Sequence, residues 1–335
     1  MVSRHAYAAT LAFDEQIERG VANMRYARLG TSGVNASRVA LGVMRIADKS
    51  GEEAAEVVST ALDSGINFFD SADGYAGGES SRRFGTALKD LHVQRENIFI
   101  QTKFGIYRDE ESGEITRYDF SKDHLIAALD GELERLQTDY VDFVLLHRPD
   151  TLVELDQLAE AFNELQSSGK VRHFGVSNVN PMQVELLQSA VSQKLEVNQL
   201  QFGLGHTGMV QQEFHVNMID KPSIDHDGGL ISYSRLKHMT IQAWSPFQYG
   251  FFEGVFLDNP KFPELNEALD RLAEECHVTK SAIAVAWILR HPAHMQVLLG
   301  SMTPSRISDM AAGAEVELSA SQWYGLYCAA GNDLP

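Results

Sequence analysis

Cysteine is scarce in this chain of 335 residues, which contains only Cys276 and Cys328. No CxxC pair is present and the two cysteines lie 52 residues apart without a second cysteine near either, so the sequence predicts neither a disulfide framework nor a zinc site. This cysteine usage fits a reducing compartment, and we expect a cytoplasmic protein. Apolar runs of about 18 residues, which a membrane span requires, are also missing, so no membrane partner is expected.

Positive charge is the second shortage. Lysine and arginine number 28 against 46 aspartates and glutamates, which gives a formal net charge of -18. Phosphate neutralisation requires clustered basic residues, so a nucleic-acid partner is not expected. Residues 1–24 carry early acidic residues and no compact apolar core, unlike a signal peptide. We interpret them as an N-terminal extension ahead of one domain spanning residues 25–335.

Eight short apolar segments alternate with helix-like segments from residue 25 onward. We predict strands at residues 40–42, 66–70, 98–103, 140–147, 171–178, 195–199, 240–244 and 295–301. Several are apolar almost throughout, which is typical of strands buried on both faces of a parallel sheet. The alternation allows a closed barrel or an open doubly wound sheet. Because the first strand-to-helix junction, LGVMRIADKSG, lacks GxGxxG, we predict a single (β/α)₈ TIM barrel.

Capping patterns predict where several helices begin. Ser50 with Glu53, and Thr151 with Glu154, have the spacing of capping boxes. One long segment, residues 203–229, shows no clear periodicity and is predicted to be an irregular loop. Loops of this length in compact domains are usually functional or mobile.

Polar side chains follow the apolar strands at the points where the strands end. In a (β/α)₈ barrel the active site lies at these C-terminal ends. The residues found there are Asp70, Lys103, His147, Ser177, Asn178, Gln199, Trp244 and Ser301. Charged groups are costly to bury unpaired, so their repeated placement after apolar runs indicates a shared site. Each alone could have an ordinary role, such as a helix cap for Asp70, a solvated strand end for Lys103 or a core histidine for His147.

Tyr75 lies in the segment SADGYAGGES, directly after the second predicted strand. A phenol has a reference pKa of about 10, so it donates a proton near neutrality only when its anion is stabilised. Lys103 would stabilise that anion, and Asp70 would keep the ammonium charged and in place. His147 would hydrogen-bond the substrate oxygen, where negative charge develops as a carbonyl becomes an alcohol. Taken alone, Tyr75 could be an ordinary loop aromatic. No strong nucleophile or metal-ligand cluster accompanies the set, so no metal is expected.

Carbonyl reduction also requires a hydride source, which a cofactor carries. Ser177, Asn178 and Gln199 offer hydroxyl and amide groups suited to a carboxamide. Trp244 offers a flat face on which a ring can stack. These side chains predict a cofactor with a ring and an amide.

The segment GSMTPSRI ends the last predicted strand and begins a helix at Pro304. Ser301, Thr303 and Arg306 surround that helix start. Free N–H groups at a helix start together with a guanidinium form an anion site, and a phosphate is its natural occupant. The ordinary alternative for Arg306 is a surface arginine.

Seven motifs in fixed order resemble the aldo-keto reductase family over residues 25–335. They are FFDSADGY, QTKFG, LLHRPD, SGKVRHFGVSN, EVNQ, QAWSP and GSMTPSRI. LLHRPD and SGKVRHFGVSN are especially similar to the bacterial oxidoreductase branch. The resemblance implies a catalytic tetrad of Asp70, Tyr75, Lys103 and His147. It also implies NADP(H) bound in an extended pose and hydride transfer from nicotinamide C4 to an aldehyde or ketone.

The family's cofactor contacts are carried over residue by residue. The resemblance places them at Gly42, Met44, Ser177, Asn178, Gln199, Trp244, Ser245, Pro246, Phe247, Gly250, Gly300, Ser301, Thr303, Arg306 and Asp309. The chain departs from the family pattern at four positions. Gly300 stands where many members have Lys or Arg, which removes one phosphate partner. Asp309-Met310 replaces a Glu-Asn pair at the adenine, and Gln201 replaces a glutamate.

A carbonyl reductase acting on a small-molecule substrate is the leading functional hypothesis. One alternative is an NADPH-binding regulatory subunit with slow turnover, as in the potassium-channel β-subunits. Another is a lyase or aldolase that uses Lys103 as a Schiff base. Aromatic residues could line an apolar substrate pocket or simply pack the loops together. They are Phe104, Tyr107, Phe202, Phe247, Tyr249, Phe251 and Phe252. No oligomeric state is predicted.

Overall fold

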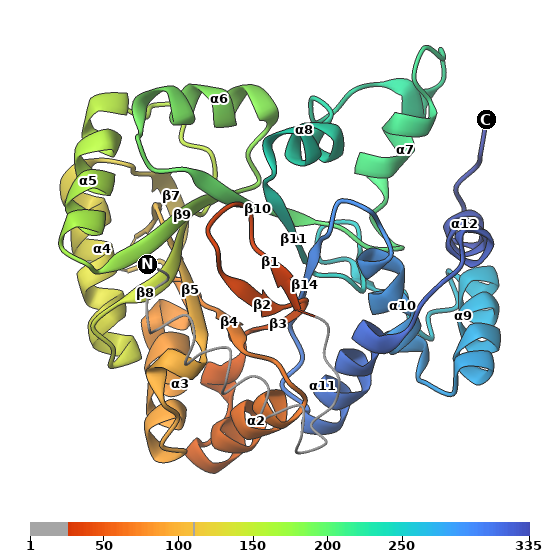
Figure 1. The fold of residues 1–335 in the computed structure, drawn as a ribbon, viewed down its shortest axis with the longest axis horizontal. Helices are drawn as coiled ribbons and strands as arrows, with labels where there is room; N and C mark the ends of the chain where they lie inside the picture. The colour runs from red at the N-terminus through yellow and green to blue at the C-terminus, as the bar shows by residue number, and fades with distance from the viewer. Residues whose placement is uncertain (1–25, 110) are drawn as a thin grey trace, which may run out of the picture.

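A closed barrel of eight parallel strands forms the centre of the chain (Figure 1). The computed structural model describes residues 26–109 and 111–335, and the predicted extension, residues 1–24, lies outside them. The barrel strands are β3 (Val39–Gly42), β4 (Phe68–Asp70), β5 (Phe99–Phe104), β8 (Val141–Leu146), β9 (Val171–Ser177), β10 (Leu195–Gln201), β11 (Thr240–Trp244) and β14 (Gln296–Leu299). They are ordered around the barrel as they are in the chain, and β14 closes on β3. The predicted (β/α)₈ TIM barrel is confirmed.

Helices surround the barrel and cover the outward faces of its strands (Figure 1). Within the described residues they are α2 (Gly51–Asp63), α3 (Glu79–Asp90), α4 (Lys122–Leu136), α5 (Leu155–Ser167), α6 (Pro181–Ala190), α7 (Gly208–Phe214), α8 (Leu230–Lys237), α9 (Pro263–Cys276), α10 (Lys280–Leu289), α11 (Pro304–Ala311) and α12 (Ala320–Ala329). Short 3₁₀ turns occur at Ile46–Asp48, Tyr75–Gly78, Arg95–Asn97, Lys221–Ser223 and Ala312–Glu315. Because the barrel strands have helices outside and side chains inside, nearly all their residues are buried, as their apolar runs predict.

The two predicted capping boxes have different outcomes. At α2, the Ser50 side chain accepts from the Glu53 amide and the Glu53 side chain accepts from the Ser50 amide, which confirms the prediction. At α5 the prediction is wrong, because the helix begins later. Glu154 itself is the N-cap and makes no side-chain capping bond. Asp150 instead accepts from the Leu152 amide in the preceding turn, so that turn replaces the first predicted helical turn.

A hairpin not predicted from the sequence closes one end of the barrel. Its strands are β1 (Tyr26–Arg28) and β2 (Asn35–Ser37), paired antiparallel. Leu29 and Ala36 of this hairpin are buried in one cluster with Phe68, Phe143 and Val197 of the barrel interior. The hairpin therefore seals the end of the barrel opposite the C-terminal ends of its strands.

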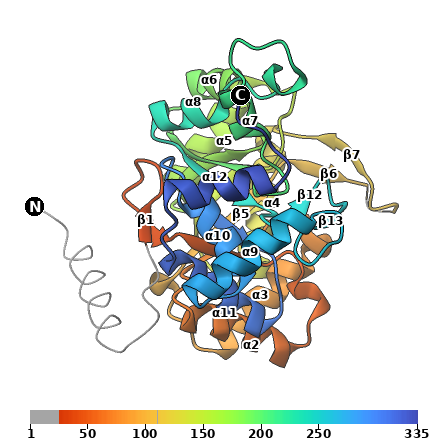
Figure 2. The same cartoon turned by 90° about the vertical axis from the view of Figure 1, so that its right-hand side faces the viewer.

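Loops at the C-terminal ends of the strands carry two more antiparallel pairs. One joins β6 (Ile106–Arg108) to β7 (Ile115–Tyr118), and the other joins β12 (Gln248–Tyr249) to β13 (Gly254–Val255). Figure 2 shows β1 at its left edge and these four strands at its right, so the two ends of the barrel are built differently.

The segment 203–229 is only partly the irregular loop that its sequence predicts. It contains α7 and the 3₁₀ turn Lys221–Ser223, so the prediction is wrong over those residues. The helix has just two buried apolar residues, Met209 and Val210, which gives too short an apolar stripe to be recognised by periodicity. Within residues 26–109 and 111–335, no helix is long and apolar enough to cross a membrane.

Candidate active site

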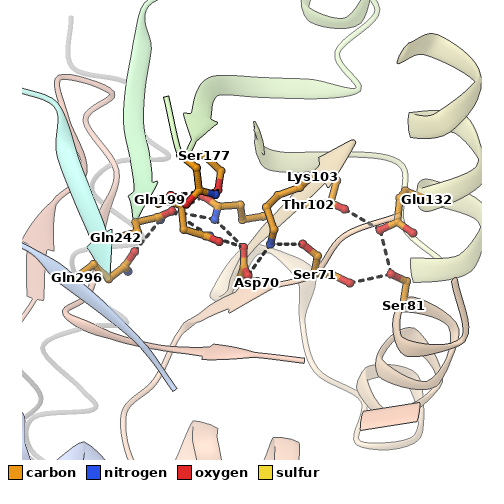
Figure 3. Close-up of polar contacts among 12 residues, drawn as sticks. Asp70, Ser71, Ser81, Thr102, Lys103, Glu132, Ser177, Gln199, Gln242 and Gln296 are labelled. Carbon is orange, nitrogen blue, oxygen red and sulfur yellow. Dashed lines mark hydrogen bonds and ion pairs between the residues drawn. The ribbon is translucent and has the colours of Figure 1, made fainter. Parts of the chain in front are cut away.

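A buried ion pair lies at the C-terminal end of the barrel (Figure 3). Lys103 Nζ, on β5, donates to Asp70 Oδ2 at the end of β4 over 2.6 Å and to the Ser71 carbonyl over 2.7 Å. Lys103 is fully buried, and Asp70 is 3% exposed. Desolvating both charges is expensive unless further hydrogen bonds satisfy them. Here the surrounding groups do so.

The second carboxylate oxygen of Asp70 is held by two amides. Gln101 Nε2 donates to Asp70 Oδ1 over 2.7 Å, and Gln199 Nε2 donates to the same oxygen over 3.0 Å. Lys103 occupies the other oxygen, so both oxygens of the buried carboxylate have donors. Asp70 is consequently fixed in one orientation, with Lys103 held beside it.

Tyr75 lies against Lys103, with the ammonium nitrogen 5.0 Å from the centre of the phenol ring. Burial raises the pKa of Tyr75 above its ordinary value, and the Lys103 charge opposes this without reversing it. Burial also disfavours the Lys103 ammonium, but Asp70 and Tyr75 outweigh that effect and leave the pKa of Lys103 raised. A protonated phenol therefore faces a charged ammonium, which stabilises the phenolate only as it forms.

His147 completes the group that the sequence predicted. Its ring lies edge-on to the Tyr75 ring, with centroids 5.8 Å apart and planes at 82°. Burial, followed by the charges of Lys103, Arg148 and Arg108, holds the pKa of His147 well below its ordinary value. The imidazole is therefore neutral, and its Nδ1 is buried without a hydrogen-bond partner among the described residues. A neutral ring with a free nitrogen is suited to hydrogen-bonding a substrate oxygen.

A row of glutamines extends from this group through the barrel interior (Figure 3). Gln101 and Gln242 exchange hydrogen bonds of 2.9 and 3.1 Å, and Gln242 also donates to Gln296 over 2.8 Å. Gln296 donates to the carbonyl of Ser37, at the end of the β2 strand. These buried amides were not predicted, because a glutamine in a strand sequence does not reveal which way it points.

Glu132 of α4 supports the opposite side of the ion pair (Figure 3). Although fully buried, it accepts from Thr102 over 2.7 Å, from Ser81 over 2.9 Å and from Arg135 over 3.0 Å. Ser81 in turn contacts the Ser71 hydroxyl at 2.7 Å. Because the Ser71 carbonyl accepts from Lys103, this network fixes the loop that carries the acceptor.

A cavity of about 770 Å³ opens above these groups. The predicted site residues that line it are Gly42, Met44, Asp70, Tyr75, His147, Ser177, Asn178, Gln199, Trp244, Ser245, Pro246, Phe247, Gly300, Ser301 and Arg306. Lys103 lies beneath the lining, fully buried. Gly250, Thr303 and Asp309 do not line the cavity. The carbonyl of Gly250 instead accepts from Gln201 over 2.9 Å.

The amide and hydroxyl groups in the cavity wall hold one another in place. Ser177 Oγ donates to the Gln199 carbonyl over 3.0 Å, and Asn178 Nδ2 donates to Ser177 Oγ over 2.8 Å. Trp244 Nε1 donates to Asn178 Oδ1 over 3.2 Å. Asn178 and Ser245 have left-handed backbone, with φ of 58° and 49°. Such strain in non-glycine residues concentrates at binding sites, where it aims particular groups.

The other end of the cavity lies beside the start of α11. This helix begins at Pro304, as predicted, although the Thr303 side chain makes no capping bond. Ser301 and Arg306 line the cavity there. Arg45, which sequence reasoning missed, also lines it and donates to the Gly300 carbonyl over 3.3 Å. Two guanidiniums therefore flank a helix start, which favours a bound anion.

Comparison with known proteins identifies the family. The model of the aldo/keto reductase family matches residues 38–326. The chain belongs to the aldo-keto reductase family. Its relatives include a 6-dehydroglucose reductase from Agrobacterium fabrum, 32% identical over 87% of this chain and 93% of that protein. The uncharacterised oxidoreductase YcsN of Bacillus subtilis is 33% identical over 89% and 96%, and the oxidoreductase YdhF of Escherichia coli is 31% identical over 92% and 98%.

Solved structures share the fold of this aldo-keto reductase. A thermostable aldo-keto reductase, Tm1743, in complex with the inhibitor epalrestat has a TM-score of 0.74 and 24% identity over 91% of this chain and all of its own. An aldo-keto reductase from Klebsiella pneumoniae in complex with NADPH has a TM-score of 0.71 and 21% identity, covering 90% and 94%.

The aromatic residues expected to line a substrate pocket divide into two groups in this aldo-keto reductase. Phe247 and Phe252 do line the cavity, and Phe252 stacks on Trp244 with ring centroids 6.2 Å apart. The others do not line it: Phe104, Tyr107, Phe202, Tyr249 and Phe251. Phe202, for example, is fully buried and stacks on Trp287 in the core. Among the described residues, no group of three or more histidine, cysteine, aspartate or glutamate side chains is placed to hold a metal.

Proposed function

We propose that this aldo-keto reductase is a cytoplasmic enzyme that uses NADP(H) to reduce an aldehyde or ketone to an alcohol, with Tyr75 as the proton donor. The observation that carries the proposal is the fully buried ammonium of Lys103 beside Asp70 and Tyr75, which both line the cavity. Relatives described as reductases support the direction of the reaction.

Each member of the tetrad has a distinct task. Tyr75 keeps its proton until the substrate oxygen gains negative charge, and then donates it. Lys103 stabilises the phenolate as it forms, while Asp70 keeps the ammonium charged and aimed. His147, neutral at physiological pH, donates a hydrogen bond that orients the substrate oxygen beside Tyr75. General acid catalysis of this kind contributes about 10²–10⁴-fold in rate.

The cavity wall fits a nicotinamide dinucleotide. Ser177, Asn178 and Gln199 would hold a carboxamide, and the indole of Trp244 would stack on a flat ring. When bound, the cofactor supplies the hydride. A related fold in complex with NADPH supports the assignment of this cofactor class.

The preference for the phosphorylated cofactor depends on cations beside α11. Arg306 lies in the first turn of that helix, and Arg45 lies next to Gly300. A Cβ on Gly300 would lie 3.7 Å from Arg45 Nη1, so the guanidinium occupies space beside the position where other members carry a basic residue. Arg45 would thus replace the missing phosphate partner, giving two guanidiniums for the 2′-phosphate.

The buried state of Lys103 disfavours the lyase or aldolase alternative. A Schiff-base lysine needs a neutral, accessible amine, which usually results from a lowered pKa. Lys103 instead has a raised pKa, is fully buried and donates to Asp70 over 2.6 Å. Its geometry matches a fixed charge rather than a nucleophile.

Tyr75→Phe tests the proposal, because it removes only the phenolic hydroxyl and keeps the ring. We expect the kcat of Tyr75→Phe for a simple aldehyde to fall by about 10²-fold or more, with NADPH binding near wild type. The assay follows oxidation of NADPH and of NADH in separate reactions. Tyr118→Phe is the matched control, since Tyr118 is 39% exposed on β7 and does not line the cavity. Retained turnover in Tyr75→Phe would exclude Tyr75 as the acid, and tight NADPH binding without turnover in the wild type would favour the regulatory subunit.

A further inference from the structure

The charge of the cavity lining is opposite to that of the whole chain. Although the chain has a formal net charge of -18, the lining contains five basic side chains and two acidic ones. The basic residues are Arg45, Arg108, Arg148, Lys280 and Arg306, and the acidic ones are Asp70 and Asp258. Concentrating positive charge in one cleft of an acidic protein attracts anions to that cleft.

Three of the five cations are already accounted for. Lys280 forms ion pairs of 2.7 Å with both Asp258 and Asp270. Arg45 and Arg306 lie beside the start of α11, at the end of the cavity proposed for the cofactor phosphate. Arg108 and Arg148 remain.

These two guanidiniums lie at the reacting end of the cavity. Arg148 directly follows His147, and its Cζ is 6.0 Å from the centre of the Trp244 ring. Arg108 lies on β6 beside the loop that carries Tyr75, with its Nε 3.6 Å from where a Cβ on Gly74 would be. Both charges act on His147, where each lowers the pKa of the imidazole.

Neither guanidinium has a carboxylate partner within ion-pair distance among the described residues. Arg108 donates to the Gly113 carbonyl over 3.0 Å, and Arg148 lies over the Trp244 ring. Asp227 lines an adjoining cavity together with Arg148. Its carboxylate, however, accepts from the amides of Gly229 and Leu230 at 2.9 and 3.1 Å.

We propose that Arg108 and Arg148 form an anion subsite, so that the preferred substrates are carbonyl compounds carrying a carboxylate or a phosphate ester. Guanidinium groups match both anions through paired hydrogen bonds. The anion would lie at the mouth, between the β6–β7 hairpin and the end of β8, while the carbonyl oxygen faces Tyr75 and His147. This inference rests on the proposed function and adds a substrate class to it.

Matched aldehyde pairs test the subsite. In 4-formylbenzoate and 4-formylbenzamide the shapes are nearly equal and only the charge differs, and 4-formylphenyl phosphate tests the phosphate ester. We expect wild-type kcat/KM to favour a charged aldehyde about tenfold or more over the amide, because hydrogen bonds to charged groups are the stronger ones. The two charged compounds show which anion the subsite prefers.

Arg108→Gln and Arg148→Gln should each lower the preference for the charged aldehyde several-fold while leaving turnover of the amide near wild type. Arg117→Gln is the matched control, because Arg117 belongs to the same hairpin but stacks on Tyr107 and does not line the cavity. Added salt should reduce the wild-type preference. Equal kcat/KM for charged and neutral aldehydes in the wild type would overturn the subsite. A preference that survives in both variants would also overturn it.

Two further measurements distinguish a substrate subsite from a cofactor contact and from a failure of turnover. The affinity for NADPH should be unchanged in Arg108→Gln and Arg148→Gln, and a large loss in both would assign these guanidiniums to the cofactor instead. Calorimetric titration of 4-hydroxymethylbenzoate and its amide onto the full chain with NADP⁺ requires no turnover. Preferential binding of the acid would support the subsite even if no aldehyde were reduced, and equal binding would contradict it.

Discussion

Replacing Asp73 with asparagine should change how the stability of this protein depends on pH. Asp73 lies in the loop between Asp70 and Tyr75, where its amide donates to the Lys103 carbonyl over 3.0 Å. Its Oδ1 is buried and has no hydrogen-bond partner among the described residues. Burial, and then the charge of Glu132, raise the pKa of Asp73 from 3.8 to about 7. At neutral pH this carboxyl is therefore close to its protonation midpoint.

The sign and size of the effect follow from that raised pKa. Between pH 3.8 and about pH 7 the Asp73 carboxyl keeps its proton in the folded protein, whereas the unfolded chain has released it. The stability that this bound proton contributes is therefore fully present at low pH and is lost as the pH rises through about 7. One pKa unit corresponds to about 1.4 kcal/mol. From about pH 5 to about pH 8 the wild type should therefore lose about 3 kcal/mol that the asparagine variant does not lose.

Urea unfolding at about pH 5 and about pH 8 measures the difference. We expect the difference in free energy of unfolding, Asp73→Asn minus wild type, to be about 3 kcal/mol larger at about pH 8 than at about pH 5. Asp119→Asn is the control. Partial burial acts to raise the pKa of Asp119, but hydrogen bonds from Ser121 help to lower it below its ordinary value. That carboxylate is ionised in both states at both pH values. A relative stability of Asp73→Asn that stays constant with pH would refute the raised pKa.

Two other substitutions test the cofactor end and the barrel interior. Arg45→Gln should reduce the preference for NADPH over NADH about tenfold in kcat/KM, because it removes one guanidinium from the phosphate site. The control is Arg82→Gln, on the exposed side of α3, which should leave the preference unchanged. Gln242→Leu should lower the free energy of unfolding by about 1–3 kcal/mol, measured in urea, because Gln101 and Gln296 lose buried partners. An unchanged preference in the first case, or unchanged stability in the second, would contradict these assignments.

The barrel could be predicted because its strands are buried on both faces. A run such as the apolar residues of β8 is readable without context, since helices cover it outside and side chains fill it inside. The β1–β2, β6–β7 and β12–β13 pairs could not be predicted. They have two to four residues in each strand, which is too short for an alternating pattern to emerge.

The pairing of Asp70 with Lys103 was readable for a related reason. A charged residue at the end of an apolar strand, such as Asp70 or Lys103, is conspicuous because burying it demands a partner. Arg45, Arg108 and Arg148 gave no such signal. They lie in loops or at strand margins, where arginine is common, and only the folded structure shows that they face one cavity. The pKa of Tyr75 was also beyond sequence reasoning, because burial outweighs the charge of Lys103.

The glutamine row bears on how the protein is made on the ribosome. Gln296 donates to the carbonyl of Ser37, which emerges 259 residues earlier. Until β14 has been synthesised, Gln242 lacks one of its partners and the barrel has no strand to close on β3. A nascent chain shorter than this would carry Asp70, Tyr75, Lys103 and His147, but in a sheet that has not closed and whose glutamine row lacks Gln296. Catalytic competence should therefore appear in a single step, when β14 pairs with β3, rather than build up as the chain lengthens.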